Sequence, residues 1–458
     1  FTRAVVEVGW GKRAMSISLR VSLLSGEGVV LDVDLGSTIG ELQEVLQEKL
    51  QTSYINGLIC PSGRKLPSSS KVSDLGLQDG DDLTVVCRQA MLLASSRARC
   101  FTLLRSDGSV LRWGLRGCFD SSSILDNLSV KDLCCSRGAF AALLQDHTVV
   151  TWGWPDEGGD SEKVKEQLRD VRSLEATDQA FSALLENGRV VTWGNPRAGG
   201  DSRHIQEDLQ DVWQVKGASK AFAAITVDGS VYAWGAGPAS IIGPVQKQLH
   251  PGVVALAATD EAFAAIRADG QVVTWGHLPG YLEREFLEDQ QLPVVLRVVA
   301  TRGAFAAICE DGSVFTWGNP AQGGDSEAVQ HLLRNIRSMA ATASAFAALT
   351  SLGDVVVWGD AAEGGALDDA ARARLKAAPA RRLVATRGAF AALLVSGEVV
   401  TWGDDMSGGA SLSVQHRLKD VQQVVANSSA FAALLPDQKV VTWGSPFAGG
   451  LDAFEEEF

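Results

Sequence analysis

AFAAICEDGSVFTWG, residues 304–318, is one of nine copies of a single motif that run from residue 100 to the end of this 458-residue chain. In every copy a tryptophan follows a phenylalanine by 12 residues, and successive copies start 39 to 44 residues apart, most often 41. A motif with this period is typical of a repeat architecture in which each unit packs on its neighbours. The pairs are Phe101 and Trp113, Phe140 and Trp152, Phe181 and Trp193, Phe222 and Trp234, Phe263 and Trp275, Phe305 and Trp317, Phe346 and Trp358, Phe390 and Trp402, and Phe431 and Trp443.

Each copy predicts a β-hairpin. Residues 139–144 are apolar and rich in small side chains, which favours a strand packed closely on both faces. A turn follows, and in four copies it is an Asp-Gly pair such as Asp311-Gly312, which tolerates the positive φ of a tight hairpin. The returning strand carries the tryptophan, and a glycine ends it. A further strand is expected at residues 171–176, leading into the next copy.

The segment between two hairpins has helical spacing. The sequence GGDS at 158–161 offers a turn and an N-cap, and Val164, Leu168 and Val171 follow at intervals of four and three residues. The predicted unit is therefore a strand, a helix and a hairpin, and it is too small to bury its own apolar faces.

The Asp-Gly turn followed by V-x-T-W-G resembles the propeller family of the regulator of chromosome condensation, over residues 100 to about 450. This resemblance implies a β-propeller-like array. The family's recurring histidine, 13 residues before the tryptophan, is alanine in eight copies and Cys100 in the first, and its preceding glycine is commonly threonine, as at Thr177. The family has seven blades and this chain has nine copies, so eight blades, nine blades or an open stack are all compatible with the sequence.

A different pattern precedes the repeats. Apolar residues alternate over 16–24, a turn follows at 25–28, and Thr38 with Glu41 forms a capping box before a helical stripe of Ile39, Leu42, Leu46 and Leu50. Two short strands after that helix complete a ββαββ order. The fold class expected for the whole chain is mostly β, with an α+β N-terminal domain of the β-grasp type.

Residues 15–88 resemble the ubiquitin superfold, with matching segments in the same order. The resemblance implies an apolar recognition patch at Leu24, Ile59 and Val86, although these residues could simply cover the sheet. Ubiquitin's terminal di-glycine is absent after Arg88, so this domain is not expected to be a conjugated tag. The predicted organisation is a leader or extension at 1–14, a ubiquitin-like domain at 15–88, a linker at 89–99 and a repeat domain at 100–458.

Composition and motif content exclude several classes of function. A net charge of −14 and a pI near 5.0 argue against broad contact with nucleic acid. No apolar run reaches the roughly 18 residues that cross a bilayer. Seven cysteines without a C-x-x-C pair indicate free thiols in a reducing, intracellular compartment. The histidines lack metal-ligand spacing, and nucleophile and P-loop motifs are missing, so we expect no catalytic residues, metal or cofactor.

Residues that break the repeat are the candidates for binding a partner. The repeated tryptophans are interpreted as packing between units and not as a ligand cage, and the Asp of GGD as a cap and not a calcium ligand. Trp154 and Trp213 lie outside the repeated set and could anchor a partner or fill gaps. The sequence thus favours a non-catalytic protein-interaction scaffold or a structural subunit of an assembly. Alternatives are an accessory component of ubiquitin signalling and a guanine-nucleotide exchange factor.

Overall fold

The computed structural model describes residues 7–8, 16–23, 28–49, 55–61, 64–67, 70–87, 90–94, 100–104, 110–114, 130–250, 252–278, 293–436 and 438–450. The chain divides into two compact units, one formed by residues 1–91 and 103–111 and the other by 92–102 and 112–458. No helix within the described ranges is both long enough and apolar enough to span a membrane.

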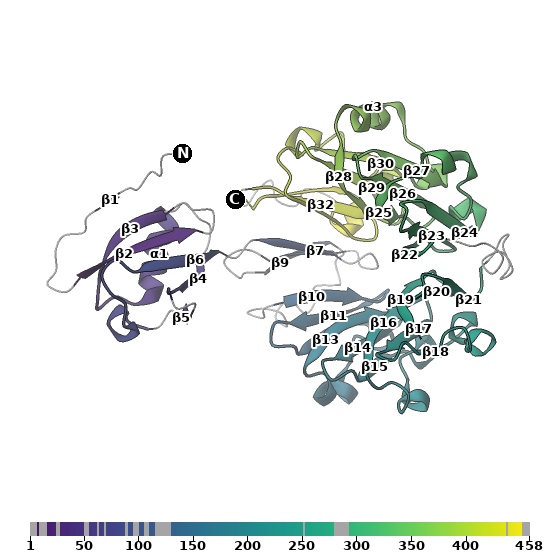
Figure 1. The fold of residues 1–458 in the computed structure, drawn as a ribbon, viewed down its shortest axis with the longest axis horizontal. Coiled ribbons are helices and arrows are strands. Elements are labelled where there is room, and N and C mark those ends of the chain that lie inside the picture. Colours follow the sequence, from purple (N-terminus) through teal and green to yellow (C-terminus); the bar gives the residue numbers. More distant parts are fainter. Residues whose placement is uncertain are drawn as a thin grey trace. The chain divides into compact units, whose positions relative to one another are not determined.

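The first unit is a mixed sheet with one α-helix (Figure 1). The central strands β2 and β6 run parallel, and the strands on either side of this pair, β3 and β4, run antiparallel to them. The sheet order is β1-β3-β2-β6-β4-β5, which is the β-grasp arrangement predicted from the sequence. Its strands are β1 (Glu7–Val8), β2 (Ser16–Leu23), β3 (Gly28–Asp34), β4 (Ile55–Ile59), β5 (Lys65–Leu66) and β6 (Asp82–Cys87), and a 3₁₀ turn, η1 (Val72–Leu75), lies before β6.

Helix α1 (Ile39–Lys49) begins at the predicted capping box. The Thr38 amide donates to Glu41 Oε2 at 2.9 Å, and the Glu41 amide donates to Thr38 Oγ1 at 3.2 Å. These two bonds satisfy amide groups that the first helical turn leaves without partners. Ile39, Leu42 and Leu46 are buried against the sheet, as their spacing predicts, while Leu50 lies outside the described residues.

The repeats form a β-propeller-like array of three-stranded sheets, nine of them in the described residues (Figure 1). The first sheet is β7 (Met91–Ala94), β8 (Cys100–Leu104) and β9 (Val110–Gly114), so a strand lies within 89–99, where the sequence predicts a linker.

Each of the other eight sheets also has three strands, in chain order. The first strands of these sheets are β10 (Val130–Cys135), β13 (Val171–Ala176), β16 (Val212–Gly217), β19 (Val253–Ala258), β22 (Val295–Ala300), β25 (Ile336–Ala341), β28 (Ala380–Ala385) and β31 (Gln423–Ala426). The second strands are β11 (Ala139–Leu144), β14 (Ala180–Leu185), β17 (Ala221–Thr226), β20 (Ala262–Arg267), β23 (Ala304–Cys309), β26 (Ala345–Thr350), β29 (Ala389–Leu394) and β32 (Ala430–Leu434). The third strands are β12 (Val149–Gly153), β15 (Val190–Gly194), β18 (Val231–Gly235), β21 (Val272–Gly276), β24 (Val314–Gly318), β27 (Val355–Gly359), β30 (Val399–Gly403) and β33 (Val440–Gly444).

The prediction of an α-helix in each unit is wrong for most units. Short 3₁₀ segments replace it, and α3 (Asp369–Ala377) is the one α-helix among the described repeat residues. The segments after the third strands are η2 (Pro155–Glu157), η4 (Pro196–Ala198), η6 (Pro238–Ser240), η8 (Pro320–Gln322), η10 (Ala361–Glu363), η11 (Asp405–Ser407) and η13 (Pro446–Ala448). Those before the next sheets are η3 (Glu162–Gln167), η5 (Arg203–Ile205), η7 (Gly243–Val245), η9 (Glu327–Leu332) and η12 (Gln415–Arg417).

The repeated phenylalanine and tryptophan face each other across the hairpin. Phe181 pairs with Trp193 in the strand register, and their rings stack with centroids 5.3 Å apart. The Trp193 Nε1 donates to the Gly158 carbonyl of the preceding unit at 3.0 Å. The same bond to the preceding unit is made by Trp234, Trp275, Trp358, Trp402 and Trp443. These six tryptophans therefore join neighbouring units.

The last sheet contacts the first. Gln423 in β31 accepts a hydrogen bond from the Leu92 amide and donates one to the Leu92 carbonyl, both at 3.1 Å. Gly449 lies so close to Trp113 that an added Cβ would sit 2.8 Å from the Trp113 ring, just as Gly158 faces Phe181 of the next unit. These contacts place the last sheet beside the first.

Candidate functional site

The predicted apolar patch of the first unit is placed in part. Ile59 is partly exposed at the end of β4, between the buried residues Leu58 and Cys60. The strand register pairs Ile59 with Thr84 and Gly57 with Val86, so Ile59 and Val86 lie on neighbouring strands. Leu24 lies outside the described residues.

The two irregular tryptophans differ in their surroundings. Trp154 is 68% exposed and precedes η2. A Cβ added at Gly138 would lie 3.1 Å from the Trp154 ring, so this ring covers the turn between β10 and β11. Trp213, in contrast, is half-buried in β16 and packs against the core between its own sheet and the next. Trp154 is thus available to a partner, whereas Trp213 contributes to packing.

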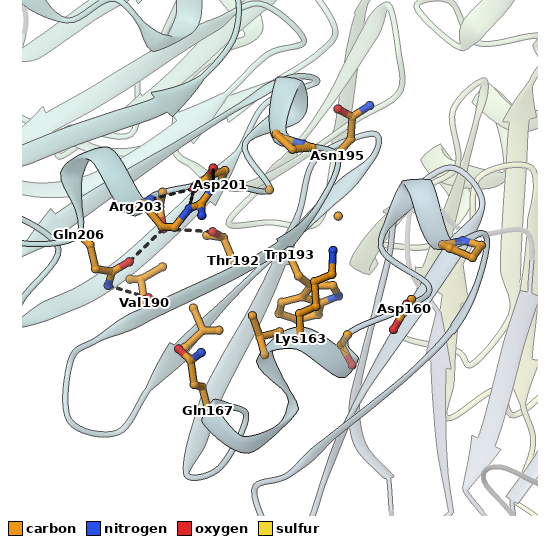
Figure 2. Close-up of a pocket in the computed structure, with 18 of the residues that line it drawn as sticks. Asp160, Lys163, Gln167, Val190, Thr192, Trp193, Asn195, Asp201, Arg203 and Gln206 are labelled. Atoms are coloured by element: carbon orange, nitrogen blue, oxygen red, sulfur yellow. Dashed lines mark hydrogen bonds and ion pairs between the residues drawn. The ribbon is translucent and has the colours of Figure 1, made fainter.

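A pocket of about 810 Å³ opens between two neighbouring units (Figure 2). Asp160, Lys163 and Gln167 line it from one unit. Residues from Val190 to Gln206 line it from the next, where Arg203 bonds to Asp201 at 2.6 Å. That pairing, chiefly the hydrogen bond from the Arg203 side chain, lowers the pKa of Asp201 to about 2.

The polar groups in this pocket mostly bond to one another. The hydroxyls of Thr192 and Ser202 are 3.0 Å apart, and Gln206 Nε2 donates to the Val190 carbonyl at 3.1 Å. The same pair of bonds recurs in two other units, at Thr316, Ser326, Gln330 and Val314, and at Thr401, Ser411, Gln415 and Val399. A network that recurs in several units belongs to the construction of the repeat and gives no specific site.

The Asp of the GGD turns lies one position before the N-cap, which is Ser161, Ser202 or Ser326, although the sequence predicts that the Asp itself is the cap. Asp160, Asp201 and Asp325 each accept a hydrogen bond from the backbone amide two residues further on, at 2.9 to 3.1 Å. Among the residues that the structure describes, no three His, Cys, Asp or Glu side chains are grouped to hold a metal ion.

A second candidate lies at the turns between the first and second strands. Here the residue two positions before the second strand bonds through its backbone amide to the carbonyl of the equivalent residue in the next unit, at 2.8 to 3.0 Å. Seven such bonds join eight units in succession. We call these positions the turn ring: Arg137, Asp178, Ser219, Asp260, Arg302, Ala343, Arg387 and Ser428. Because only backbone atoms make these bonds, the side chains are left for other contacts.

Five side chains of the turn ring are charged. Arg137 pairs with Asp178 at 2.9 Å, and Arg302 lies 3.8 Å from Asp260. Arg387 has Ala343 and Ser428 as its ring neighbours, and no ion pair to it is found among the described residues. The ring therefore has three arginines for two aspartates, and Arg387 carries the excess charge.

Charges from several units act on Arg387. Its side chain is exposed, yet desolvation by the surrounding protein lowers its pKa, with a further lowering by Arg302. Asp260 and Asp178 oppose this change and Arg137 adds to it, so charges from four other units act on the pKa of this one side chain.

Exposed apolar side chains lie at the same end of the sheets. In eight units the residue after the Trp-Gly pair donates its amide to the turn, as Trp154 does to Gly138 at 2.9 Å, so 3₁₀ segments such as η2, η11 and η13 lie next to the turn ring. On these segments Met406 is 65% exposed and Phe447 is 70% exposed. Trp154, Met406 and Phe447 thus share one end of the array with Arg137 and Arg387.

The turn ring was not predicted from the sequence. Its positions show little common pattern, because the residue changes between Arg, Asp, Ser and Ala from unit to unit. The available sequence signal was that these residues vary from unit to unit next to a motif that does not vary. Variable residues in surface turns are often the ones that bind partners.

The array is similar to several solved structures, but no family model and no curated protein matches this chain. Yeast RCC1 (Prp20), solved bound to Kap60, is 17% identical with a TM-score of 0.39, over 75% of this chain and 86% of that one. The receptor kinase CR4 ectodomain from Physcomitrella patens is 17% identical with a TM-score of 0.37, over 60% and 73%. A ubiquitin-based designed protein is 23% identical with a TM-score of 0.15, over 16% and 90%. At these values no family is assigned, and the strand pairings above define the architecture.

Proposed function

We propose that this chain is a non-catalytic protein-interaction scaffold whose repeat array binds protein partners through the end that carries the turn ring. The observation that supports this most is the division of roles between residues. The repeated side chains are buried and hold the units together, whereas the residues that differ between units, such as Trp154 and Arg387, are exposed at one end.

Capture of partners by the full-length chain tests this proposal. Proteins that co-purify with it after crosslinking would be identified by mass spectrometry and then mixed with it in purified form. We expect at least one of them to bind directly and to be crosslinked to residues near the turn ring. Crosslinks confined to the opposite end of the sheets would contradict the proposed surface.

A role in ubiquitin signalling is the second candidate, favoured by the β-grasp sheet order and by the partly exposed Ile59. In this proposal residues 15–88 form a ubiquitin-like domain that docks on ubiquitin receptors. Ile59→Ala should weaken binding to a panel of such receptors, while Leu352→Ala, at an apolar side chain 80% exposed in the repeat array, should not. Equal binding by both variants and the unmodified protein would remove this candidate.

Nucleotide exchange on a small GTPase is the activity that the family resemblance implies. Release of labelled GDP from a panel of small GTPases tests it, and unchanged release at stoichiometric protein would exclude it for that panel.

A further inference from the structure

Three exposed arginines lie at the end of the sheets that carries the hairpin turns, opposite to the turn ring. Arg337 belongs to β25, and Arg381 and Arg382 belong to β28, the first strand of the next sheet. Arg337 and Arg381 occupy equivalent positions, because the strand register shifts at both and leaves each as the extra residue of a β-bulge. We call these three residues, which come from two adjacent units, the arginine cluster.

Hydrogen bonds place the members of the cluster beside one another. Arg337 Nη2 donates to the carbonyls of residues 380 and 381, at 3.4 and 3.0 Å. Arg381 Nη2 donates in turn to the carbonyls of residues 421 and 422, at 2.9 and 3.4 Å. Within the described part of the chain these two side chains make no other hydrogen bond, and none of the three arginines forms an ion pair. The cluster therefore holds two guanidinium groups in place and leaves most of their N–H donors for a ligand.

The turns that flank the cluster carry no charge. In both units the hairpin turn bonds to the residue that directly precedes the first strand or lies next to it. The Ser351 amide donates to the Asn335 carbonyl, and the Val395 amide donates to the Pro379 carbonyl, both at 2.9 Å. None of these four residues is acidic, so the backbone that surrounds the cluster brings no carboxylate to neutralise it.

The acidic side chains of these units lie further away, with one exception. Asp354 and Glu398 directly precede β27 and β30, and in each sheet the second strand separates this third strand from the first. Two strand spacings amount to about 10 Å, which exceeds the screening length of about 8 Å at physiological salt. The exception is Asp420, which lines a pocket together with Arg381. Three positive charges are thus set against one nearby negative charge, in a chain whose net charge is −14.

The pocket beside Arg381 has a volume of about 400 Å³. Ser396 contributes a hydroxyl to its lining, and Val395, which is 64% exposed, contributes apolar surface. Leu352 lies in the corresponding hairpin turn of the preceding unit and is 80% exposed. The surface therefore offers guanidinium and hydroxyl donors to an anion, next to apolar side chains that can contact whatever carries the anion.

We infer that the arginine cluster binds a phosphorylated serine or threonine in a segment of a partner protein, whose apolar neighbours contact Val395 and Leu352. A phosphate carries about 1.5–2 negative charges and three acceptor oxygens, so it engages several guanidinium groups at once, whereas a carboxylate offers two oxygens. Arginine clusters are a recurring means of recognising such groups. The exposed apolar side chains favour a polypeptide as the carrier of the phosphate. The inference goes beyond the proposed function, because it adds a second surface at the other end of the array and makes binding there depend on phosphorylation.

Binding of defined peptide pools to the whole protein tests the inference. Three pools of fluorescent peptides would share leucine and valine flanks and carry phosphoserine, serine or glutamate at the centre. Fluorescence anisotropy should give the phosphoserine pool an affinity about tenfold above that of the other two, and the difference should shrink with added salt. Equal affinities, a preference for glutamate, or no binding of any pool would overturn the inference.

A competitor distinguishes a protein partner from a small phosphate compound. Inositol hexakisphosphate would be tested alone by calorimetry and as a competitor of the phosphoserine pool. Competition between the two supports a phosphate site at the cluster. Binding of the hexakisphosphate without binding of any peptide pool would show that a small polyphosphate is the ligand, and the inference would fail.

Variants assign the binding to the cluster. Arg381→Gln and Arg382→Gln should each weaken binding of the phosphoserine pool about fivefold or more. Asp420→Asn should strengthen it about twofold, because this change removes the one opposing charge that lines the pocket. Binding that keeps its full strength in Arg381→Gln would refute the site.

Arg172→Gln is the matched control. Arg172 is also exposed and is the extra residue of the equivalent bulge in β13. There, however, the Glu186 amide bonds to the Asp170 carbonyl, so acidic residues occupy the places that are neutral beside the cluster. This variant should bind the phosphoserine pool like the unmodified protein, and an equal loss in it would count against a local site. Circular dichroism melting would verify that each variant is folded.

The two ends of the array give separate outcomes. A direct partner that crosslinks near the turn ring and binds Arg381→Gln normally, with no preference for the phosphoserine pool, would exclude the phosphate site and leave the scaffold function standing. If the phosphoserine pool binds and Arg381→Gln abolishes that binding, while no cellular partner crosslinks near the turn ring, the phosphate site stands and the proposed surface fails.

Discussion

Threonine 177 makes two hydrogen bonds that tie a turn of the ring to the 3₁₀ segment beside it. Its hydroxyl donates to the Ala198 carbonyl at 2.8 Å and accepts from the Ala180 amide at 3.0 Å. Thr301, Thr342 and Thr386 make the same pair of bonds, and Ser136 and Asn427 do so with other side chains. In the sequence these threonines are seen only as a departure from a glycine of the resembling family. The structure shows that their hydroxyls hold the turn to the 3₁₀ segment.

Thr177→Val should destabilise the protein, because it keeps the shape of the side chain but leaves the Ala180 amide and the Ala198 carbonyl buried without a partner. We expect a loss of about 1–3 kcal/mol in the free energy of unfolding. Thr177→Ser retains the hydroxyl and should cost less than half as much, as the native Ser136 indicates. Urea denaturation measures both, and equal losses would contradict this role of the hydroxyl.

The Asp201 carboxylate gives a titration prediction. Its pKa of about 2 in the folded protein lies below the ordinary value of 3.8, chiefly because the Arg203 side chain donates to it. Its contribution to stability is therefore complete above pH 3.8 and is lost as the pH falls toward 2. Carbon-detected NMR titration should show the pKa of Asp201 returning toward its ordinary value in Arg203→Gln. An unchanged pKa would mean that the backbone amide of residue 203 suffices.

At the scale of elements, the hairpins were predictable and the connections were not. Every hairpin combines a phenylalanine, a turn and a tryptophan at fixed spacing, and Gly229, Gly270 and Gly312 take the positive φ that Asp-Gly turns require. The spacing of Val164, Leu168 and Val171 indicated a helix, but Val164 lies in η3 and Val171 already starts β13. From Val164 to Val171 the chain forms a 3₁₀ segment followed by a residue in the left-handed conformation. This path brings the side chains of Val164, Leu168 and Val171 to the core, as a helix would.

A left-handed residue ends these connections. Asp170, Asp211, Asn335 and Asp420 have φ between 51° and 54°, and each precedes the first strand of a sheet. Asp and Asn tolerate this conformation better than other non-glycine residues. The recurring Asp-Val and Asn-Ile pairs were the available sequence signal against a continuous helix.

The close approach of Gly199 to the next sheet gives a stability prediction. Its φ is +93°, and a Cβ there would lie 2.6 Å from the Phe222 ring of the next sheet. Gly199→Ala should therefore cost about 2–4 kcal/mol through backbone strain and overpacking. Gly243→Ala is the control, because nothing lies within 4 Å of its added Cβ, and thermal melting should place it close to the unmodified protein. Similar melting temperatures for the two variants would argue against this close packing of units.

For the whole molecule, the sequence predicted repetition but left closure open. Counting motifs gives nine units, and the contacts of Gln423 and Gly449 show that the last sheet lies beside the first. These contacts join residues more than 300 positions apart, as the separation of 331 between Leu92 and Gln423 shows, and no local pattern reports them. The turn ring escaped prediction for the same reason, since its residues meet only when the units are assembled.

Gln423→Ala tests closure of the array. Gln214 is the matched control, because its side chain also accepts from a first-strand amide, that of Leu256 at 3.3 Å, but between sheets adjacent in the chain. Loss of Gln423 should increase proteolysis of the terminal sheets about fivefold, whereas Gln214→Ala should change it little, since the covalent connection keeps its neighbours together. Equal proteolysis of the two variants would show that the junction between the last and the first sheet is as stable as the junctions between sheets adjacent in the chain.

The turn ring also bears on how such a protein can change over generations. Its units are joined there through main-chain atoms, which every residue except proline can supply in full. Mutations at the exposed positions of the ring, Arg137, Asp260, Arg302 and Arg387, can accordingly drift or be selected for new partners with little penalty to folding, whereas Ala343 and Ser428 are buried. Related chains should then diverge fastest at these exposed positions while their phenylalanines, tryptophans and glycines stay fixed.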